Sequence, residues 1–433
     1  MSDSQRFPPQ VHLNLNVRGL EHSATIAINE RSNALRREGR DIVRLGLGQS
    51  PFPVPAPMVA ALRESAGEKD YLPVKGLPRL REAIVEYYRR TEGLDYHPDH
   101  VLVGPGTKEL MFLVQLVYYG DLVIPAPSWV SYAPQARIIG RHLHWLPTRI
   151  ESGLGVTPEA LERLCAVDPE RPRLLILNYP GNPTGTTYPP ESLEAIAEIA
   201  RRYRLLVLAD EIYSGLHFEG GHVSIARYYP EGTIISNGLS KWAGAGGWRL
   251  GAFTFPASLK WLVDTMAAVA SETFTATAAP IQYAAIRGFE DSQDMQDYLS
   301  RTRRILAALM RHAWRRLEGI GAELTEPRGG FYVFPNFTPL REQLNAKGVL
   351  TSPELCERAL ERAGVAFLPG TAFGRPEHEL SVRMACVDFD GARAMAALDE
   401  LAPGECPDTA FLARYCQPTF DGIERLCDWI TRP

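Results

Sequence analysis

The chain has 433 residues, of which 45% are hydrophobic, and its 46 basic and 51 acidic side chains give a net charge of −5. This length predicts two or more domains, and the lack of a basic excess argues against a nucleic-acid-binding protein. Six cysteines without a CxxC pair indicate neither a metal site nor a disulfide framework. Without a membrane-length apolar run or a signal-peptide pattern, we expect a cytoplasmic protein with no membrane partner.

The first hundred residues predict helices and connectors. Apolar residues at helical spacing indicate a helix over Ser23–Glu38, and a short strand is expected at Ile42–Leu47. Four prolines between residues 51 and 57 then mark a connector. Two further helices are expected at about Met58–Ala66 and Pro78–Arg90.

In the middle of the chain, short apolar runs alternate with amphipathic helices. The runs that we expect to be strands are Val101–Val103, Leu122–Ile124, Leu174–Leu177, Leu205–Leu208, Thr233–Ile235 and Ala252–Phe255. Such alternation predicts an α/β fold with a parallel sheet between helices. Ligands of such sheets bind beyond the carboxyl ends of the strands.

The last third of the chain predicts a second, smaller α+β domain. A long helix is expected at Asp291–Gly319, followed by strand-like and helical pieces without long parallel runs. We assign residues 49–290 to a large domain and 291–433 to the small one, with residues 1–48 packing on the small domain. An extra tail at about 403–433 includes a helix near Phe420–Ile430.

The segment Ser236–Gly251 holds Lys241 among small residues, with Arg249 eight positions further on. If this lysine is shielded from water, its pKa falls and the free amine becomes a nucleophile able to form a Schiff base. Arg249 can supply a fixed charge for a phosphate. Taken alone, the segment is equally compatible with a surface lysine beside a glycine loop.

Three other strand ends carry chemically notable residues. Gly104–Lys108 offers backbone N–H groups for a phosphate, although many such turns contain glycine for geometry alone. Asn178–Gly185 is either a plain turn or a stiff loop that holds the amide of Asn182 in place. Asp210 is either a helix N-cap or a buried carboxylate that needs a positive partner, such as a protonated ring nitrogen. Tyr213 could reach the same ligand.

Trp129 and Arg383 are two further candidate site residues. Trp129 could stack on a flat ring or belong to the core. Arg383, between apolar neighbours, could hold a substrate carboxylate or form a structural salt bridge. A lysine nucleophile, an aspartate for a pyridinium, an aromatic plate, phosphate donors and a carboxylate clamp are together what a pyridoxal phosphate (PLP) enzyme acting on an amino acid requires.

The order and spacing of these segments resemble the class I/II aminotransferases of PLP fold type I, most closely the bacterial-type aspartate aminotransferase subgroup. The segments that carry the resemblance are SATIAIN (Ser23–Asn29), YLPVKGLPRLREAI (Tyr71–Ile84), GTKEL (Gly106–Leu110), PAPSWVSY (Pro125–Tyr132), NYPGNPTG (Asn178–Gly185), DEIY (Asp210–Tyr213), NGLSK…GWRLG (Asn237–Gly251) and SVR (Ser381–Arg383). The resemblance implies a large domain with a mostly parallel seven-stranded sheet, pyridoxal 5'-phosphate as cofactor, and transfer of an amino group from an L-amino acid to a 2-oxo acid.

The resemblance also implies residue roles around the cofactor ring. Lys241 would bond to the cofactor and then move the proton at the substrate's α-carbon. Asp210 would pair with the pyridine nitrogen. Tyr213 and Asn182 would hydrogen-bond the phenolic oxygen, and Trp129 would stack on the ring.

Further implied roles concern the phosphate, the substrate and a partner subunit. The residues that would hold the phosphate are Gly106, Thr107, Lys108 and Arg249. Tyr71 is similar to the tyrosine that reaches the phosphate from the partner subunit, which implies a homodimer with shared active sites. Arg383, with Gly48 and Asn182, looks like the α-carboxylate site, and the Asn182–Pro183 bond is expected to be cis.

The substrate is less well marked than the cofactor. Thr25 and Lys108 resemble residues that hold the distal carboxylate of acidic substrates, which favours aspartate or glutamate as one amino donor. The chain departs from the family's usual residues at Gly48–Pro51, Ala245–Gly246 and Ser271–Pro280. A PLP-dependent lyase, cyclase or oxidase of a biosynthetic pathway therefore stays open as an alternative. A regulator without turnover is disfavoured because neither terminus has the room or charge for a DNA-binding domain.

Overall fold

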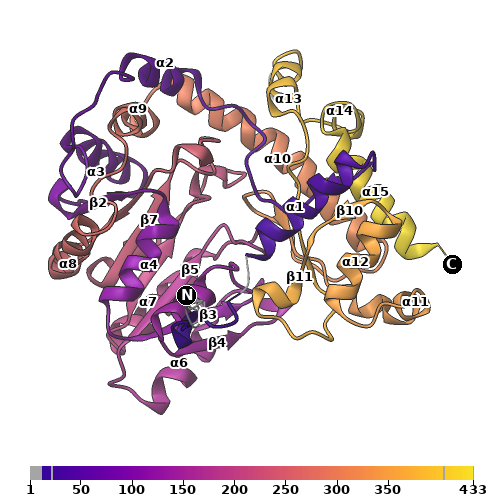
Figure 1. Cartoon of the computed structure of the whole chain (residues 1–433), viewed down its shortest axis with the longest axis horizontal. Coiled ribbons are helices and arrows are strands. Elements are labelled where there is room, and N and C mark those ends of the chain that lie inside the picture. The colour runs from indigo at the N-terminus through magenta and orange to yellow at the C-terminus, as the bar shows by residue number, and fades with distance from the viewer. Residues whose placement is uncertain (1–11, 21–22, 403–404, 433) are drawn as a thin grey trace, which may run out of the picture.

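The computed structural model describes residues 12–20, 23–402 and 405–432. The Pro-containing start of the chain and parts of the predicted tail lie outside these described residues. Figure 1 shows the elements in two groups, one around a large sheet and one formed mainly by the last third of the chain.

The large sheet has seven strands in the order β2-β8-β7-β6-β5-β3-β4. The strands are β2 (Val101–Gly104), β3 (Asp121–Ala126), β4 (Leu143–Pro147), β5 (Arg173–Asn178), β6 (Leu206–Asp210), β7 (Thr233–Gly238) and β8 (Gly251–Thr254). Neighbours from β4 to β7 pair in parallel, whereas β8 runs antiparallel to β2 and β7. The mostly parallel seven-stranded sheet implied by the sequence is confirmed.

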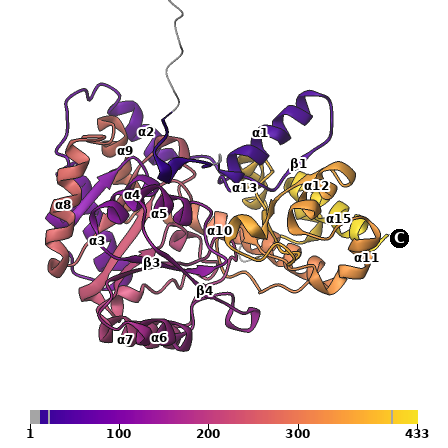
Figure 2. The same cartoon turned by 60° about the horizontal axis from the view of Figure 1, so that its bottom comes forward.

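Helices cover both faces of this sheet (Figure 2). One face carries α4 (Thr107–Val117), α5 (Tyr132–Ile139) and α8 (Lys260–Ser271), and the other carries α6 (Pro158–Val167) and α7 (Pro190–Arg202). Along β5, Leu174 and Ile176 pack with the first set, whereas Leu175 and Leu177 pack with the second. Because both faces are buried, the central strands are continuous apolar runs in the sequence.

Three more helices pack together beside the β2 end of the sheet. They are α2 (Ala56–Glu64), α3 (Pro78–Glu92) and α9 (Ala279–Phe289). Prolines lie in the first turn of all three, where a missing N–H group costs nothing. The long helix α10 (Gln293–Gly319) then leads from α9 into the second group of elements (Figure 1).

The second group contains two small sheets. In one, β11 (Leu368–Pro369), β12 (Val382–Ala385) and β9 (Tyr332–Val333) lie antiparallel, and in the other β1 (Val43–Arg44) pairs in parallel with β10 (Val365–Ala366). The helices of this group are α1 (Ala24–Arg37), α11 (Arg341–Ala346), α12 (Ser352–Arg362), α13 (Gly391–Leu398), α14 (Thr409–Tyr415) and α15 (Gln417–Thr431). The helix predicted near Phe420–Ile430 is confirmed as α15. The strand predicted at Ile42–Leu47 shortens to β1 because β10, the strand with which it pairs, has two residues.

The cysteines form no disulfide bond with one another. All six are free thiols, and Cys406 alone is exposed. None of the helices in the described ranges is long and apolar enough to span a membrane. Within the same ranges, no cluster of three or more His, Cys, Asp or Glu side chains is arranged to hold a metal ion.

Candidate active site

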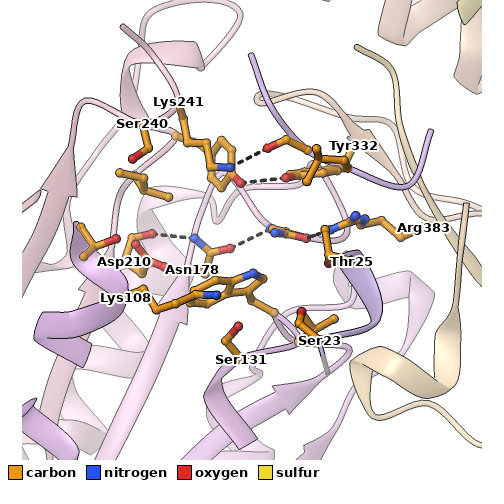
Figure 3. A pocket seen from close by; sticks show the side chains of 18 of the residues that line it. Ser23, Thr25, Lys108, Ser131, Asn178, Asp210, Ser240, Lys241, Tyr332 and Arg383 are labelled. Atoms are coloured by element: carbon orange, nitrogen blue, oxygen red, sulfur yellow. Dashed lines mark hydrogen bonds between the residues drawn. The ribbon is translucent and has the colours of Figure 1, made fainter. Parts of the chain in front are cut away.

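A cavity of about 310 Å³ lies at the carboxyl ends of the central strands, where they face the second group of elements (Figure 3). All of the predicted site residues except Gly106 and Tyr71 line it: Thr25, Gly48, Thr107, Lys108, Trp129, Asn182, Asp210, Tyr213, Lys241, Arg249 and Arg383. The start of α1, the start of α4, the ends of β5 to β7 and strand β12 therefore converge on one space.

Lys241 follows β7 and is half-buried. Its Nζ donates a hydrogen bond of 2.6 Å to the carbonyl oxygen of Gly48. The same atom lies 5.7 Å from the ring centre of Tyr213 and 5.8 Å from that of Phe331. No carboxylate among the described residues forms an ion pair with Lys241, so neutral groups hold the amine at the cavity wall.

Asp210 ends β6 and is 4% exposed. Tyr132 Oη donates to its Oδ2 at 2.5 Å, and Ser236 Oγ donates to its Oδ1 at 3.4 Å. Burial raises the pKa of Asp210 to about 6, although the hydrogen bonds from Tyr132, the Ile212 backbone and Ser236 act to lower it. No Lys, Arg or His in the described part of the chain pairs with this carboxylate, so it suits a ligand that brings a positive charge.

Arg383 on β12 is 1% exposed and lies between two aromatic rings. Its guanidinium carbon is 4.8 Å from the ring centre of Tyr332 and 5.1 Å from that of Phe373. It donates to Asn182 Oδ1 at 3.3 Å and to the carbonyl oxygen of Gly46, while its Nε has no partner in the described structure. Burial lowers its pKa. A buried guanidinium without a carboxylate partner among the described residues suits an anionic ligand.

The start of α4 and the side chain of Arg249 form an anion cradle. Gly106 caps the helix with φ +89°, and a Cβ atom there would lie 2.2 Å from an Arg249 guanidinium nitrogen. Arg249 is held by hydrogen bonds to the carbonyl oxygens of Gly246 at 3.0 Å and Pro105 at 3.3 Å. The first N–H groups of a helix lack intrahelical partners and attract anions. Gly106 therefore belongs to the site although it does not line the cavity.

Lys108 and Trp129 lie on the same wall of the cavity. Lys108 Nζ is 5.1 Å from the Trp129 ring centre, and Trp129 packs edge-on against Tyr132 at 5.2 Å. Partial burial, with the charges of Arg249 and Lys241, lowers the pKa of Lys108. Trp129 is half-buried at the cavity rather than enclosed in the core. Four basic side chains thus line the cavity against one carboxylate, which favours anionic ligands.

The loop after β5 is fixed by the hydrogen bonds of Asn178. Its Nδ2 donates to the carbonyl oxygen of Asp210 at 2.8 Å, and its Oδ1 accepts from the Asn182 N–H at 2.7 Å. The predicted cis bond at Asn182–Pro183 is confirmed; Ala126–Pro127 and Tyr179–Pro180 are also cis and were not predicted.

The sequence prediction missed three side chains at this site. Tyr132 and Asn178 fall inside segments already singled out, so their position at strand ends could have identified them. Tyr332 on β9 lies 3.0 Å, oxygen to oxygen, from Tyr213, but no local pattern marks it. Tyr71, in contrast, is 93% exposed and lies away from the cavity of its own chain.

Comparisons with known proteins agree on one family. The family model described as aminotransferase class I and II matches residues 40–396. The chain is 35% identical to aspartate aminotransferase of Geobacillus stearothermophilus over 372 residues, covering 84% of this chain and 92% of the relative. It is 34% identical to aspartate/prephenate aminotransferase of Thermus thermophilus, covering 84% and 92%.

A solved structure gives the same result. Aspartate aminotransferase from Thermus thermophilus with maleate superimposes with a TM-score of 0.81 at 30% identity, over 96% of this chain and 99% of that one. The comparisons support transamination rather than the lyase, cyclase or oxidase alternative, and the family depends on PLP. The chain belongs to the class I and II aminotransferases and is a transaminase that acts on amino acids and 2-oxo acids.

Proposed function

We propose that this transaminase binds pyridoxal 5'-phosphate in the cavity and uses aspartate or glutamate as one amino donor. The observation that carries the proposal is that the charged side chains lining this cavity form no ion pair with any described residue. Among them are the carboxylate of Asp210, the amine of Lys241 and the guanidinium of Arg383. A PLP molecule with an amino acid substrate brings a group of complementary charge or reactivity to each.

The residues around the cavity fit the cofactor's groups one by one. When bound, PLP supplies an electron sink for the charge that develops as the α-carbon loses its proton. Lys241 would provide the amine that holds the cofactor covalently and would then carry the proton at the α-carbon. The negative charge of Asp210 would keep a proton on the ring nitrogen. Tyr213 and Asn182 would donate hydrogen bonds to the ring oxygen, and Trp129 would stack on the ring.

The phosphate is proposed to bind at the start of α4. Backbone N–H groups of Gly106, Thr107 and Lys108 would face it, with the guanidinium of Arg249 beside them. The close approach of Arg249 to Gly106 supports this role because it sets a fixed positive charge next to the helix start.

The substrate carboxylates are assigned to two places. Arg383, with Asn182 and Gly48, would bind the α-carboxylate, and Lys108 with Thr25 would bind the distal carboxylate. An acidic donor is supported by the basic cavity lining. Two relatives are named for aspartate, and the similar Thermus structure holds maleate, a dicarboxylate.

We also propose a homodimer and a two-domain arrangement. Tyr71 is almost fully exposed on the loop before α3, which suits a side chain that reaches the phosphate site of a second copy. The cofactor would be carried by a large domain, residues 49–290. Residues 1–48 and 291–433 would form the small domain, which contributes Thr25 and Arg383.

Donor preference can be tested in the first half-reaction, with no 2-oxo acid present. The rate constant per concentration of L-aspartate, L-glutamate and L-phenylalanine is measured for the wild type and for Lys108→Met. Loss of one charge-assisted hydrogen bond should lower the values for the two acidic donors by about tenfold or more and leave phenylalanine nearly unchanged. An equal effect on all three donors would remove Lys108 from the proposed distal-carboxylate site.

A further inference from the structure

A second cavity lies in the C-terminal part of the chain. Its lining comes from α12, α15 and the end of α11, three helices that Figure 1 shows in the second group of elements. Its volume is about 590 Å³, and it shares no lining residue with the active site. We name it the basic groove after the side chains that surround it: Lys347, Arg358, Arg362, Arg425 and Arg432. Trp429 and a single carboxylate, Asp428, complete the charged and aromatic lining.

Three of the five basic side chains have acidic partners. Arg432 pairs at 2.8 Å with Asp428, the one acidic side chain that lines the groove. Arg425 and Arg358 pair with carboxylates that do not line the groove, at 2.7 and 3.2 Å. Such exposed ion pairs are weak, so a ligand of higher charge can compete for these arginines.

The other two basic side chains have no acidic partner in the described part of the chain. Lys347 Nζ donates to the backbone carbonyl of Arg432, and Arg362 forms no ion pair with any described residue. Helix C-termini attract cations, which accounts for Arg362 in the last turn of α12 and for Lys347 and Arg432 at the C-caps of α11 and α15. It does not account for the meeting of these three helix ends, with Arg358 and Arg425, at one cavity in a chain whose net charge is −5.

The lining indicates the chemistry of a ligand. A guanidinium group can bind a phosphate through two parallel N–H···O hydrogen bonds. Several guanidinium groups around one cavity therefore suit a chain of phosphates. Trp429 is half-buried and offers a flat aromatic surface to a ring. Trp429, Arg425 and Arg432 lie beyond residue 396, where the family match ends, so the groove is not carried by that match.

We propose that the basic groove binds a polyphosphate anion, either free or as part of a nucleoside triphosphate. Two helices that line the groove pack on strands that lead to the active site. Helix α15 packs on β1, which is followed by Leu47 and Gly48 at the cavity, and α12 packs on β11, which precedes Phe373.

The test is calorimetric titration of the PLP-loaded protein with tripolyphosphate and, separately, with ATP. If PLP binds as proposed above, it would fill the phosphate cradle of the active site, so the added anions would not bind in that cradle. The double variant Lys347→Ala/Arg362→Ala breaks no ion pair among the described residues and should weaken binding about tenfold or more. Arg163→Ala, at an exposed position on α6 without an ion pair in the described structure, should bind like the wild type.

Comparing the two ligands shows whether the basic groove binds a free polyphosphate or a nucleoside triphosphate. Tighter binding of ATP, lost in Trp429→Ala, would support the nucleotide, and equal binding of both ligands would support the phosphate chain alone. Absence of saturable binding at physiological salt, or an unchanged affinity in the double variant, would overturn the proposal. Circular dichroism checks that each variant is folded. If the double variant is not, the two single variants provide the same comparison.

Discussion

At the scale of single residues, the active site contains two buried charges, Asp210 and Arg383, without charged partners in the described chain. Asp210 shows the consequence for pH, because its raised pKa means that the fold disfavours the ionised carboxylate. The cofactor-free protein therefore loses stability as the pH rises from the usual aspartate pKa to about 6. A cationic ring nitrogen would reverse this penalty, so cofactor affinity should fall as the pH drops through about 6 and Asp210 is protonated.

Tyr132 is predicted to tune this titration. Tyr132→Phe removes the hydrogen bond to Asp210 Oδ2, so the pKa of Asp210 should rise further and the loss of PLP affinity should move to higher pH, by about one unit. Fluorescence titration with PLP between pH 5 and about 8 measures the midpoint. Tyr298→Phe is the control, since the buried Tyr298 hydroxyl has no hydrogen-bond partner in the described structure. Identical midpoints in all three proteins would show that Tyr132 does not act through Asp210.

Arg383 is predicted to act on the substrate and not on the cofactor. Arg383→Met should lower kcat/KM for amino acids by roughly 10²- to 10⁴-fold, because removing one partner of a buried charge pair costs about 3–5 kcal/mol. PLP affinity should stay close to that of the wild type. The two quantities are measured on the same preparation, by steady-state kinetics and by PLP titration. A parallel loss of PLP affinity would instead make Arg383 part of the cofactor site.

At the scale of secondary-structure elements, the ends of strands and the start of helix α4 position the residues of the active site. Fully buried strands such as β5 and β6 could be predicted because both of their faces are apolar. The edge strand β4 could not, since four of its five residues are partly or fully exposed. The direction of β8 depends on pairing with β2 and β7, which an apolar run does not encode. Tyr332 was missed for a similar reason, because long-range packing alone brings it to the site.

The helix start of α4 gives a prediction with a matched control. Gly106 and Gly93 both have positive φ, +89° and +68°, but only at Gly106 would a new Cβ meet another group, Arg249. Both alanine variants should lose stability through backbone strain. Gly93→Ala should lose about 1–2 kcal/mol from its left-handed conformation. Gly106→Ala should lose about 1–3 kcal/mol, because its ψ of 153° lies in a region that only glycine adopts readily. Gly106→Ala should in addition lose affinity for PLP, but not for pyridoxal, which lacks the phosphate. An equal effect on the two ligands would contradict the phosphate role of the α4 start.

At the scale of the whole molecule, the active site depends on contacts between the two groups of elements. Arg375 donates to the carbonyl oxygen of Ala126 at 2.9 Å, and the Ser128 N–H donates to that of Phe373 at 3.0 Å. These bonds join the end of β3 to the segment that follows β11. The positions of Arg383 and Lys241 relative to each other are therefore fixed by tertiary contacts. The sequence could identify both residues, but only the fold brings them together.

The proposed dimer is tested through Tyr71. We expect the purified protein to have twice the mass of the chain by light scattering. Tyr71→Ala should stay dimeric yet bind PLP more weakly, by about tenfold, because one hydrogen bond to the phosphate is lost. Tyr119→Ala, which changes another exposed tyrosine, is the control. A monomer with full activity would contradict shared active sites.

The most direct test of the account is a single half-reaction. The protein loaded with PLP is mixed with L-aspartate in the absence of any 2-oxo acid, and oxaloacetate, pyridoxamine phosphate and ammonia are measured. We expect one equivalent each of oxaloacetate and pyridoxamine phosphate per active site, no ammonia, and no reaction in Lys241→Ala. Release of ammonia, uptake of oxygen, or turnover by Lys241→Ala would contradict the proposed transamination through Lys241.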